Sequence, residues 1–154
     1  MKRFIASFAT LMFAATAALA QAPSSSYGTV KEAEALVHKA VAFYKKNGKE
    51  KSLAEFQKSP GPFVDRDLYV TVYSLDGVAL SHINPKMIGK SMMDLRDPTG
   101  KYHIKERMEA AAKGNSGWQD FQFFNPVSKK VEPKRMYWEK HDNLVFAAGA
   151  YKPE

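Results

Sequence analysis

The segment from Gly114 to the C-terminus constrains the fold of this chain more than any other part of its sequence. Three runs rich in aromatic and β-branched residues, Trp118–Phe124, Lys134–Lys140 and Leu144–Tyr151, are separated by turn-forming residues, among them Asp142-Asn143. Such runs are typical of β-strands, and short turns join neighbouring strands in antiparallel order. The segment therefore predicts a three-stranded antiparallel meander.

A second pair of strands precedes this meander. The run Leu68–Ser74 reads LYVTVYS, and Asp76-Gly77 separates it from a return strand at Val78–Ile83. Asp-Gly between two such runs is a strong signal for a hairpin. An irregular segment then leads through the turn at Asp97–Gly100 to a helix that we expect at Tyr102–Lys113.

The first part of the chain predicts two helices. An apolar stripe with spacings of three and four residues consists of Val30, Ala33, Val37, Ala40, Val41 and Tyr44. Thr29 can cap this helix at its N-terminus, and Asn47-Gly48 ends it near Lys46. Ser52 and Glu55 have the spacing of a capping box, which predicts a short second helix that ends near Lys58.

This order of elements predicts an α+β domain. A long N-terminal helix should pack on one face of a five-stranded antiparallel sheet, and the irregular segment from Pro85 to Gly114 should cover the other face. Irregular segments on a rigid sheet commonly carry function. We therefore expect a ligand pocket between the sheet and this segment.

The N-terminus has the pattern of a secretory signal peptide. Met1-Lys2-Arg3 is basic, Phe4–Ala17 is uncharged and apolar, and Ala18-Leu19-Ala20 matches a small-x-small cleavage site. We expect a signal peptide at 1–20, a flexible tail at 21–28 and one domain at 29–154, secreted across the inner membrane to the periplasm. The alternative is a retained anchor, although the apolar run is short for a span of about 20 residues.

Composition narrows the classes of function. The chain has no cysteine, which excludes disulfides and cysteine nucleophiles. Its formal net charge is +7, but the lysines lie in short runs and form no basic stripe of the kind that binds nucleic acid. Histidines with metal-ligand spacing and the motifs of nucleophilic or phosphate-binding enzymes are missing. We therefore expect no enzyme, no metal site, no bound cofactor and no nucleic-acid partner.

Short motifs spread through the chain resemble the single Cache domains of the second type, which are extracellular domains of bacterial sensors. From about Val30 to Tyr151 the matching positions are Tyr69-Val70-Thr71-Val72, Asp76-Gly77, Ser81-His82, Ile88-Gly89-Lys90, Asp97, Gly100-Lys101, Gly117-Trp118, Asp120-Phe121, Asn125-Pro126, Lys134, Tyr137 and Ala148-Gly149-Ala150-Tyr151. The resemblance implies a PAS-like sheet under a long helix, and binding in place of catalysis. The chain departs from the pattern at Phe121, where related sequences usually carry tyrosine, and in ending at Glu154, which suggests a free-standing domain.

The resemblance also implies a pocket for small extracellular molecules, often short organic acids. Lys134 is expected to pair with a ligand carboxylate, and Tyr137 to donate its hydroxyl. Ideal alternation places these two side chains on opposite faces of the strand, so both can serve one site only if the strand begins irregularly after Pro133. Phe121 and Phe123 share one face of their strand and are expected to form aromatic walls.

His82 and Tyr69 complete the predicted site. A neutral histidine can donate a hydrogen bond to a ligand oxygen, and a protonated one adds positive charge. Tyr69 shares a strand face with Thr71 and Tyr73. The alternative for both residues is structural, namely core packing for Tyr69 and a hydrogen bond that closes the irregular segment for His82.

The sequence thus predicts an exported Cache-type domain that captures a small metabolite, namely a short organic carboxylate. It would act in signal transduction, such as chemotaxis, through a membrane chemoreceptor or sensor kinase, with no transmembrane helix in the mature chain. Two alternatives remain open: an interaction module with a vestigial pocket that docks on a membrane sensor, and a small carrier of a cofactor such as haem.

Overall fold

The computed structural model describes residues 26–151. The predicted signal peptide at 1–20 and most of the predicted tail lie outside the described residues. The elements in chain order are α1 (Val30–Asn47), α2 (Lys49–Phe56), β1 (Val64–Asp65), β2 (Leu68–Tyr69), β3 (Thr71–Ser74), β4 (Ala79–Ser81), the 3-10 turn η1 (Pro85–Met87), α3 (His103–Lys113), β5 (Ser116–Phe124), β6 (Val131–His141) and β7 (Leu144–Tyr151).

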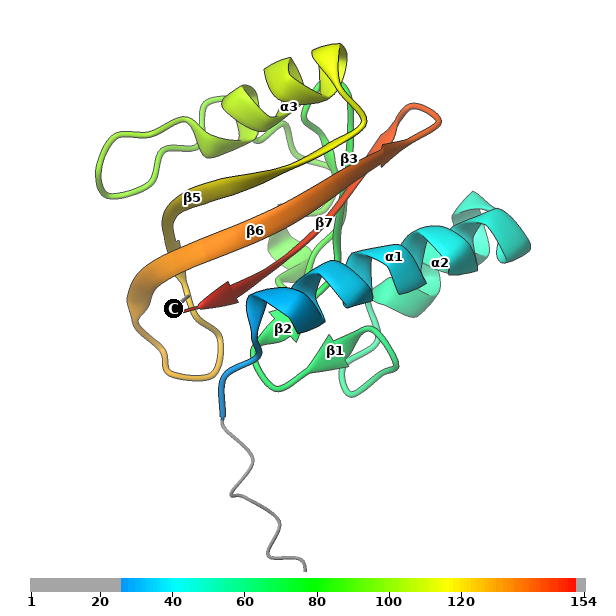
Figure 1. The fold of residues 1–154 in the computed structure, drawn as a ribbon, viewed down its shortest axis with the longest axis horizontal. Helices are drawn as coiled ribbons and strands as arrows, with labels where there is room; N and C mark the ends of the chain where they lie inside the picture. Colours follow the sequence, from blue (N-terminus) through cyan, green and yellow to red (C-terminus); the bar gives the residue numbers. More distant parts are fainter. Residues whose placement is uncertain (1–25, 152–154) are drawn as a thin grey trace, which may run out of the picture.

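A five-stranded antiparallel sheet forms the centre of the domain, with the strand order β4-β3-β7-β6-β5. The α+β fold predicted from the sequence is confirmed, and so is the C-terminal meander. Helix α1 runs along one face of the sheet, while α3 and the irregular segment lie on the other (Figure 1). Among residues 26–151 no helix has both the length and the apolar character that a membrane span needs.

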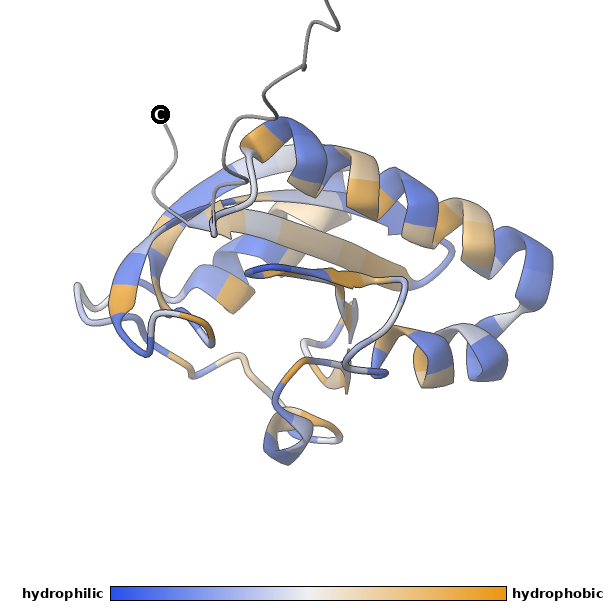
Figure 2. Ribbon diagram, turned by 90° about the horizontal axis from the view of Figure 1, so that it is seen from below, coloured by the Kyte–Doolittle hydropathy of each residue, from blue (hydrophilic) through white to orange (hydrophobic). Residues whose placement is uncertain are grey.

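Helix α1 is stabilised by a cap at its N-terminus and by an apolar face that packs on the sheet. The Thr29 hydroxyl accepts a hydrogen bond from the Glu32 amide at 3.2 Å, and the Glu32 carboxylate accepts one from the Thr29 amide at 2.7 Å. This reciprocal pair is a capping box, which satisfies two amides that have no partner inside the helix. Hydrophobic and hydrophilic residues alternate along the helix (Figure 2), and its buried stripe consists of Ala33, Leu36, Val37, Ala40 and Val41.

The second predicted capping box is wrong. Helix α2 begins at Lys49, directly after Gly48, so Ser52 lies inside the helix and not at its start. The Ser52 side chain is fully buried, and its hydroxyl has no hydrogen-bond partner among the described residues. The chain passes from α1 to α2 through Gly48, whose φ of 78° lies in the region that glycine adopts without strain.

The predicted strand Leu68–Ser74 is interrupted. Its first part, β2, pairs with β1 in a separate two-stranded sheet, and only Thr71–Ser74 joins the main sheet as β3. The predicted hairpin at Asp76-Gly77 is present, with the Gly77 amide bonded to the Ser74 carbonyl at 2.9 Å. The Asp142-Asn143 turn also joins β6 to β7 as predicted, with His141 paired to Leu144.

The sheet separates two apolar clusters. The cluster under α1 includes Val37, Phe56, Phe63, Val72 and Phe146. The cluster under α3 includes Tyr73, Ile104, Met108, Trp138 and Val145. Alternate residues of each strand face opposite sides, so β3, β6 and β7 supply residues to both clusters. The buried polar side chains Lys134, Arg107 and His103 lie on the α3 side of the sheet.

Candidate ligand-binding site

A small hollow lies between the sheet and α3, where the sequence predicts a pocket. Its lining comes from β3, the residue after β4, α3, β5 and β6, and consists of Thr71, Tyr73, His82, His103, Ile104, Arg107, Phe121, Phe123 and Met136. The volume of the hollow is about 10 Å³. That is close to the smallest cavity that holds one water molecule, so the space in this conformation is smaller than the predicted ligand.

Aromatic rings fill most of the space. His103 stacks on Phe121 with ring centroids 4.3 Å apart and an interplanar angle of 5°. Phe123 meets the His103 ring edge-on at 5.6 Å and the His82 ring at 6.2 Å. Three of the predicted residues, Phe121, Phe123 and His82, are therefore brought together, and their mutual contacts explain the small volume.

Lys134 lies in the protein interior beside these rings. Its side chain is 1% exposed, and Nζ donates a hydrogen bond to the Tyr151 hydroxyl at 3.1 Å. The ammonium lies 4.1 Å from the centroid of the Tyr69 ring and 5.7 Å from that of Phe123. Burial holds the pKa of Lys134 well below its usual value, because a charged ammonium loses its hydration there.

Tyr69 contacts Lys134 through its ring and contacts Tyr151, the hydrogen-bond partner of Lys134, through its hydroxyl. The Tyr69 and Tyr151 hydroxyls lie 3.2 Å apart, and the Tyr151 hydroxyl donates to the Phe124 carbonyl at 2.7 Å. Since that donation uses the Tyr151 proton, its oxygen is left to accept from both Lys134 and Tyr69. The predicted residues Lys134 and Tyr69 thus belong to one buried hydrogen-bonded group.

Arg107 on α3 is a second buried cation. Its side chain is 1% exposed, Nε donates to Gln119 Oε1 at 3.1 Å, and Nη2 is buried with no hydrogen-bond partner among the described residues. Burial lowers the pKa of Arg107 to about 10. The Arg107 guanidinium also repels the Lys134 ammonium, which lowers the pKa of Lys134 further.

Sequence reasoning missed Arg107, although a signal for it exists. Ile104, Met108 and Ala111 form the inward stripe of α3, and Arg107 occupies a position within the same stripe. A charged residue inside an apolar stripe is uncommon and indicates a buried charge with a function. Sequence reasoning also missed His103, at the start of α3.

The two histidines of the hollow are neutral donors or acceptors. Burial lowers the pKa of His82 to about 4, with a further contribution from Lys134, and burial also lowers that of His103 to about 4. His82 Nδ1 accepts a hydrogen bond from the Asn84 amide at 2.9 Å, so the ring proton is on Nε2. His103 Nδ1 is buried and has no hydrogen-bond partner among the residues described.

Tyr137, predicted to donate to the same ligand as Lys134, is not among the residues that line the hollow. It pairs with Ala148 and Trp118 and belongs to the apolar cluster under α1. Its hydroxyl lies 3.4 Å from His38 Nε2. β6 is regular from Val131, so the strict alternation of side chains places Tyr137 and Lys134 on opposite faces.

Comparisons with known proteins agree on one family. The family model for the single Cache domain 2 matches residues 9–146. A solved methyl-accepting chemotaxis protein from Vibrio parahaemolyticus RIMD 2210633 superposes with a TM-score of 0.68 and 25% sequence identity, over 79% of this chain and 86% of that chain. No protein of curated function matches the chain.

Two further solved structures share the fold. The periplasmic sensor domain of a chemotaxis protein superposes with a TM-score of 0.61 and 22% identity, over 80% of this chain and 90% of that one. A Cache chemosensory domain that recognises carboxylic acid superposes with a TM-score of 0.61 and 17% identity, over 80% of this chain and 88% of that one.

Proposed function

The chain belongs to the family of single Cache domains of the second type, and from that membership we propose that it is a sensory domain that binds a short monocarboxylate between its sheet and α3. Cache domains bind and sense, and their relatives here are sensor domains of chemotaxis proteins. One of these neighbours recognises carboxylic acid. The observation that carries the proposal for this chain is its pair of buried cations, Arg107 and Lys134.

Positive charge on these two buried groups is stabilised by a negative partner. No carboxylate lies within ion-pair distance of Arg107 or Lys134 among residues 26–151. The nearest acidic influence on Lys134 comes from Asp67, which is itself engaged by the Gly28 amide at 2.6 Å. A buried ion without a partner is costly, and a carboxylate bound at this place would supply the missing charge and accept from Arg107 Nη2.

The remaining lining suits a short alkyl chain. Ile104, Phe121, Phe123 and Met136 present apolar surface on the other sides of the hollow. His82 Nε2 adds one neutral donor that can bind a carboxylate oxygen. A ligand with one carboxylate and a tail of a few carbon atoms therefore matches the chemistry better than a sugar, a cation or a flat cofactor.

Binding requires the hollow to widen, because about 10 Å³ is too small for any carboxylate. Helix α3 carries Arg107 and His103, while β5 and β6 carry Phe121 and Lys134. Outward movement of α3 with the irregular segment would open the space and leave the sheet intact. A ligand stabilises the open state only by binding it more tightly than the closed one, which makes this movement the signal available to a partner.

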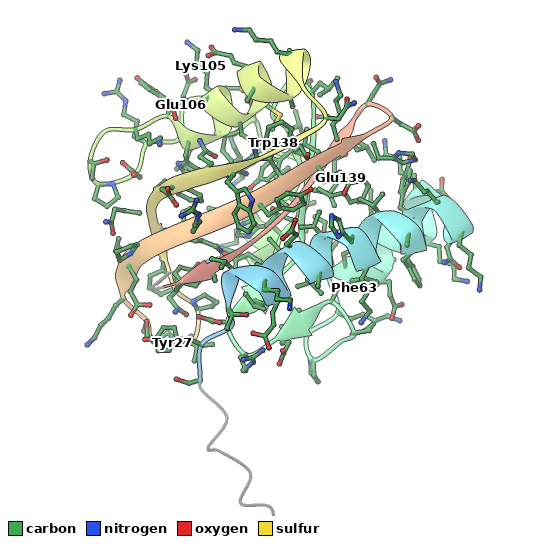
Figure 3. The ribbon with its side chains drawn as sticks, viewed as in Figure 1. Tyr27, Phe63, Lys105, Glu106, Trp138 and Glu139 are labelled. Atoms are coloured by element: carbon green, nitrogen blue, oxygen red, sulfur yellow. The ribbon has the colours of Figure 1, made fainter. Side chains whose placement is uncertain are left out.

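The test is calorimetric titration of the domain with acetate, propionate and butyrate, and with propylamine as a cation of similar size. We expect binding of at least one carboxylate and none of the amine. Arg107→Gln and Lys134→Met should each weaken carboxylate binding at least about tenfold, as expected for loss of a buried charge-assisted hydrogen bond. Lys105→Met is the matched control, because Lys105 is an exposed lysine on the same helix (Figure 3).

Either of two results would contradict the proposed anion site. If no carboxylate binds, or if Lys105→Met weakens binding as much as Arg107→Gln, the buried cations are not the anion site. A domain that docks on its partner with an unused pocket would retain docking in Lys134→Met and Arg107→Gln. That result would favour an interaction module over a ligand sensor.

A further inference from the structure

An exposed apolar and basic surface lies at the turn between β5 and β6. The side chains of Phe124, Val127 and Val131 are 49%, 50% and 52% exposed. Lys129 and Lys130, in the same turn, are exposed too. We call these five residues the hairpin patch.

An apolar groove extends the hairpin patch along the surface. The groove has a volume of about 480 Å³ and shares Phe124 with the patch; its other lining residues are His82, Ile83, Asn84, Pro85, Met87, Phe123 and Pro126. Contiguous exposed apolar surface in a soluble domain marks an interaction site.

The charge of this surface has one sign. The two segments that form it, 82–87 and 123–131, contain Lys86, Lys129 and Lys130 and no aspartate or glutamate. All three lysines are exposed. The partner that fits such a surface is therefore both apolar and negatively charged.

The chain enters and leaves the domain beside the hairpin patch. The Tyr27 hydroxyl donates to Glu132 at 3.1 Å, and the Tyr151 hydroxyl donates to the Phe124 carbonyl at 2.7 Å. Tyr27 lies at this end of the molecule, close to the start of α1 (Figure 3), and β7 ends there too (Figure 1).

We propose that the hairpin patch docks on a membrane surface rich in anionic lipid. Valine and phenylalanine side chains partition into the boundary between headgroups and acyl chains, and lysines at the same depth attract anionic headgroups. The lysines and the exposed apolar side chains of the hairpin patch lie in one turn, and the first described residues of the chain reach the same end of the molecule through the contact of Tyr27 with Glu132. The groove shares His82 and Phe123 with the hollow under α3, but none of the five residues of the hairpin patch lines that hollow, so docking through the patch does not depend on the ligand.

The test is sedimentation of the protein with lipid vesicles. Every helix and strand found among residues 26–151 lies between Val30 and Tyr151, so a chain that begins at Gln21 keeps all of these elements and lacks the apolar run Phe4–Ala17. We expect this protein to bind vesicles of phosphatidylcholine that contain about one quarter phosphatidylglycerol and not vesicles of phosphatidylcholine alone, and we expect added salt to weaken binding.

Three double variants separate the contributions. Lys129→Glu/Lys130→Glu should weaken vesicle binding at least about tenfold, since each lysine near an anionic surface contributes about 1 kcal/mol and reversal replaces attraction with repulsion. Val127→Ser/Val131→Ser keeps the charge and should weaken binding severalfold. Lys45→Glu/Lys46→Glu makes the same change of charge at the far end of α1 (Figure 1) and should leave binding unchanged.

Other outcomes overturn the proposal. Binding that is absent from anionic vesicles, or that falls equally in Lys45→Glu/Lys46→Glu, would exclude docking through the hairpin patch. A change in oligomeric state of the patch variants, without a change in vesicle binding, would assign the surface to a second copy of the chain. Loss of vesicle binding in the chain from Gln21, with binding only by the full chain, would assign membrane contact to the N-terminal run.

Discussion

Lys134 and Arg107 occupy positions where an uncharged side chain would be more stable. Both are almost fully buried, and burial lowers the pKa of each, which means that the folded state disfavours their charged forms. Residues that reduce stability persist where function requires them. The sequence indicated Lys134 only through its family resemblance, since a strand lysine after Pro133 could equally face solvent.

Replacement of the lysine should therefore raise stability while it removes binding. We expect Lys134→Met to increase the free energy of unfolding at neutral pH by about 1–3 kcal/mol, because methionine keeps the apolar stem and removes the buried charge. The gain should shrink as the pH rises toward 10.5, where the unfolded lysine also loses its proton. Urea unfolding at several pH values measures this, and a loss of stability would mean that the contacts with Tyr69 and Tyr151 outweigh burial.

His82 and His103 should make the domain sensitive to mild acid. Their folded pKa values of about 4 lie below the ordinary value of 6.5, so their contribution to stability is complete above pH 6.5 and is lost as the pH falls toward 4. Each histidine contributes at most about 1.4 kcal/mol per pH unit in this window. Thermal unfolding between these pH values should show the slope, and His82→Gln should reduce it.

The control for this pH dependence is a variant that disturbs packing and leaves the histidines in place. Phe123→Leu removes the ring that meets both imidazoles and should lower stability at every pH. The slope between pH 6.5 and pH 4 should remain. If His82→Gln keeps the full slope, another group is responsible for the acid sensitivity.

At the scale of elements, the sequence predicts the features that a few neighbouring residues determine. The stripe and cap of α1, the hairpin at Asp76-Gly77 and the turn at Asp142-Asn143 are all specified by a few neighbouring residues. The break of the strand at Val70 is not, because it depends on the pairing of β2 with β1. The spacing of Ser52 and Glu55 was misleading because a capping pattern acts only where a helix begins. The residue before α2 is Gly48, four residues earlier than the predicted cap Ser52.

The two capping patterns give a matched test. Thr29→Ala should lower the free energy of unfolding by about 1 kcal/mol, because the Glu32 amide loses its partner at the start of α1. Ser52→Ala should cost less or raise stability, because the Ser52 hydroxyl is buried without a partner among residues 26–151. Chemical denaturation of both variants measures the difference. Equal losses would show that Ser52 has a structural role that its contacts do not reveal.

At the scale of the whole molecule, the candidate site depends on how α3 crosses the sheet. Periodicity along each strand gave the faces of Phe121, Phe123 and Lys134, and the same rule placed Tyr137 on the other side. No pattern in the sequence specifies which residues of α3 meet which strand. The irregular segment and Gln119 position α3 against the sheet, and this placement brings Arg107 and His103 to the site.

Gln119 links α3 to β5 and fixes the closed form of the site. It accepts from Arg107 Nε at 3.1 Å and donates to the His103 carbonyl at 2.8 Å. A carboxylate that binds both Arg107 and Lys134 would add a second link, now between α3 and β6. The ligand should thus restrain the one helix that has to move outward to admit it.

Hydrogen exchange with and without saturating propionate tests this linkage. Amides of His103–Lys113 should exchange more slowly with the ligand bound, because local opening of α3 would break its contacts with the carboxylate. Amides of Lys49–Phe56 in α2, packed on the opposite side of the sheet, should change little when they exchange through local fluctuations (Figure 1). Arg107→Gln should abolish the protection of α3. Protection confined to α1 or α2 in a protein that binds propionate would place the ligand on the other face and reject movement of α3 as the signal.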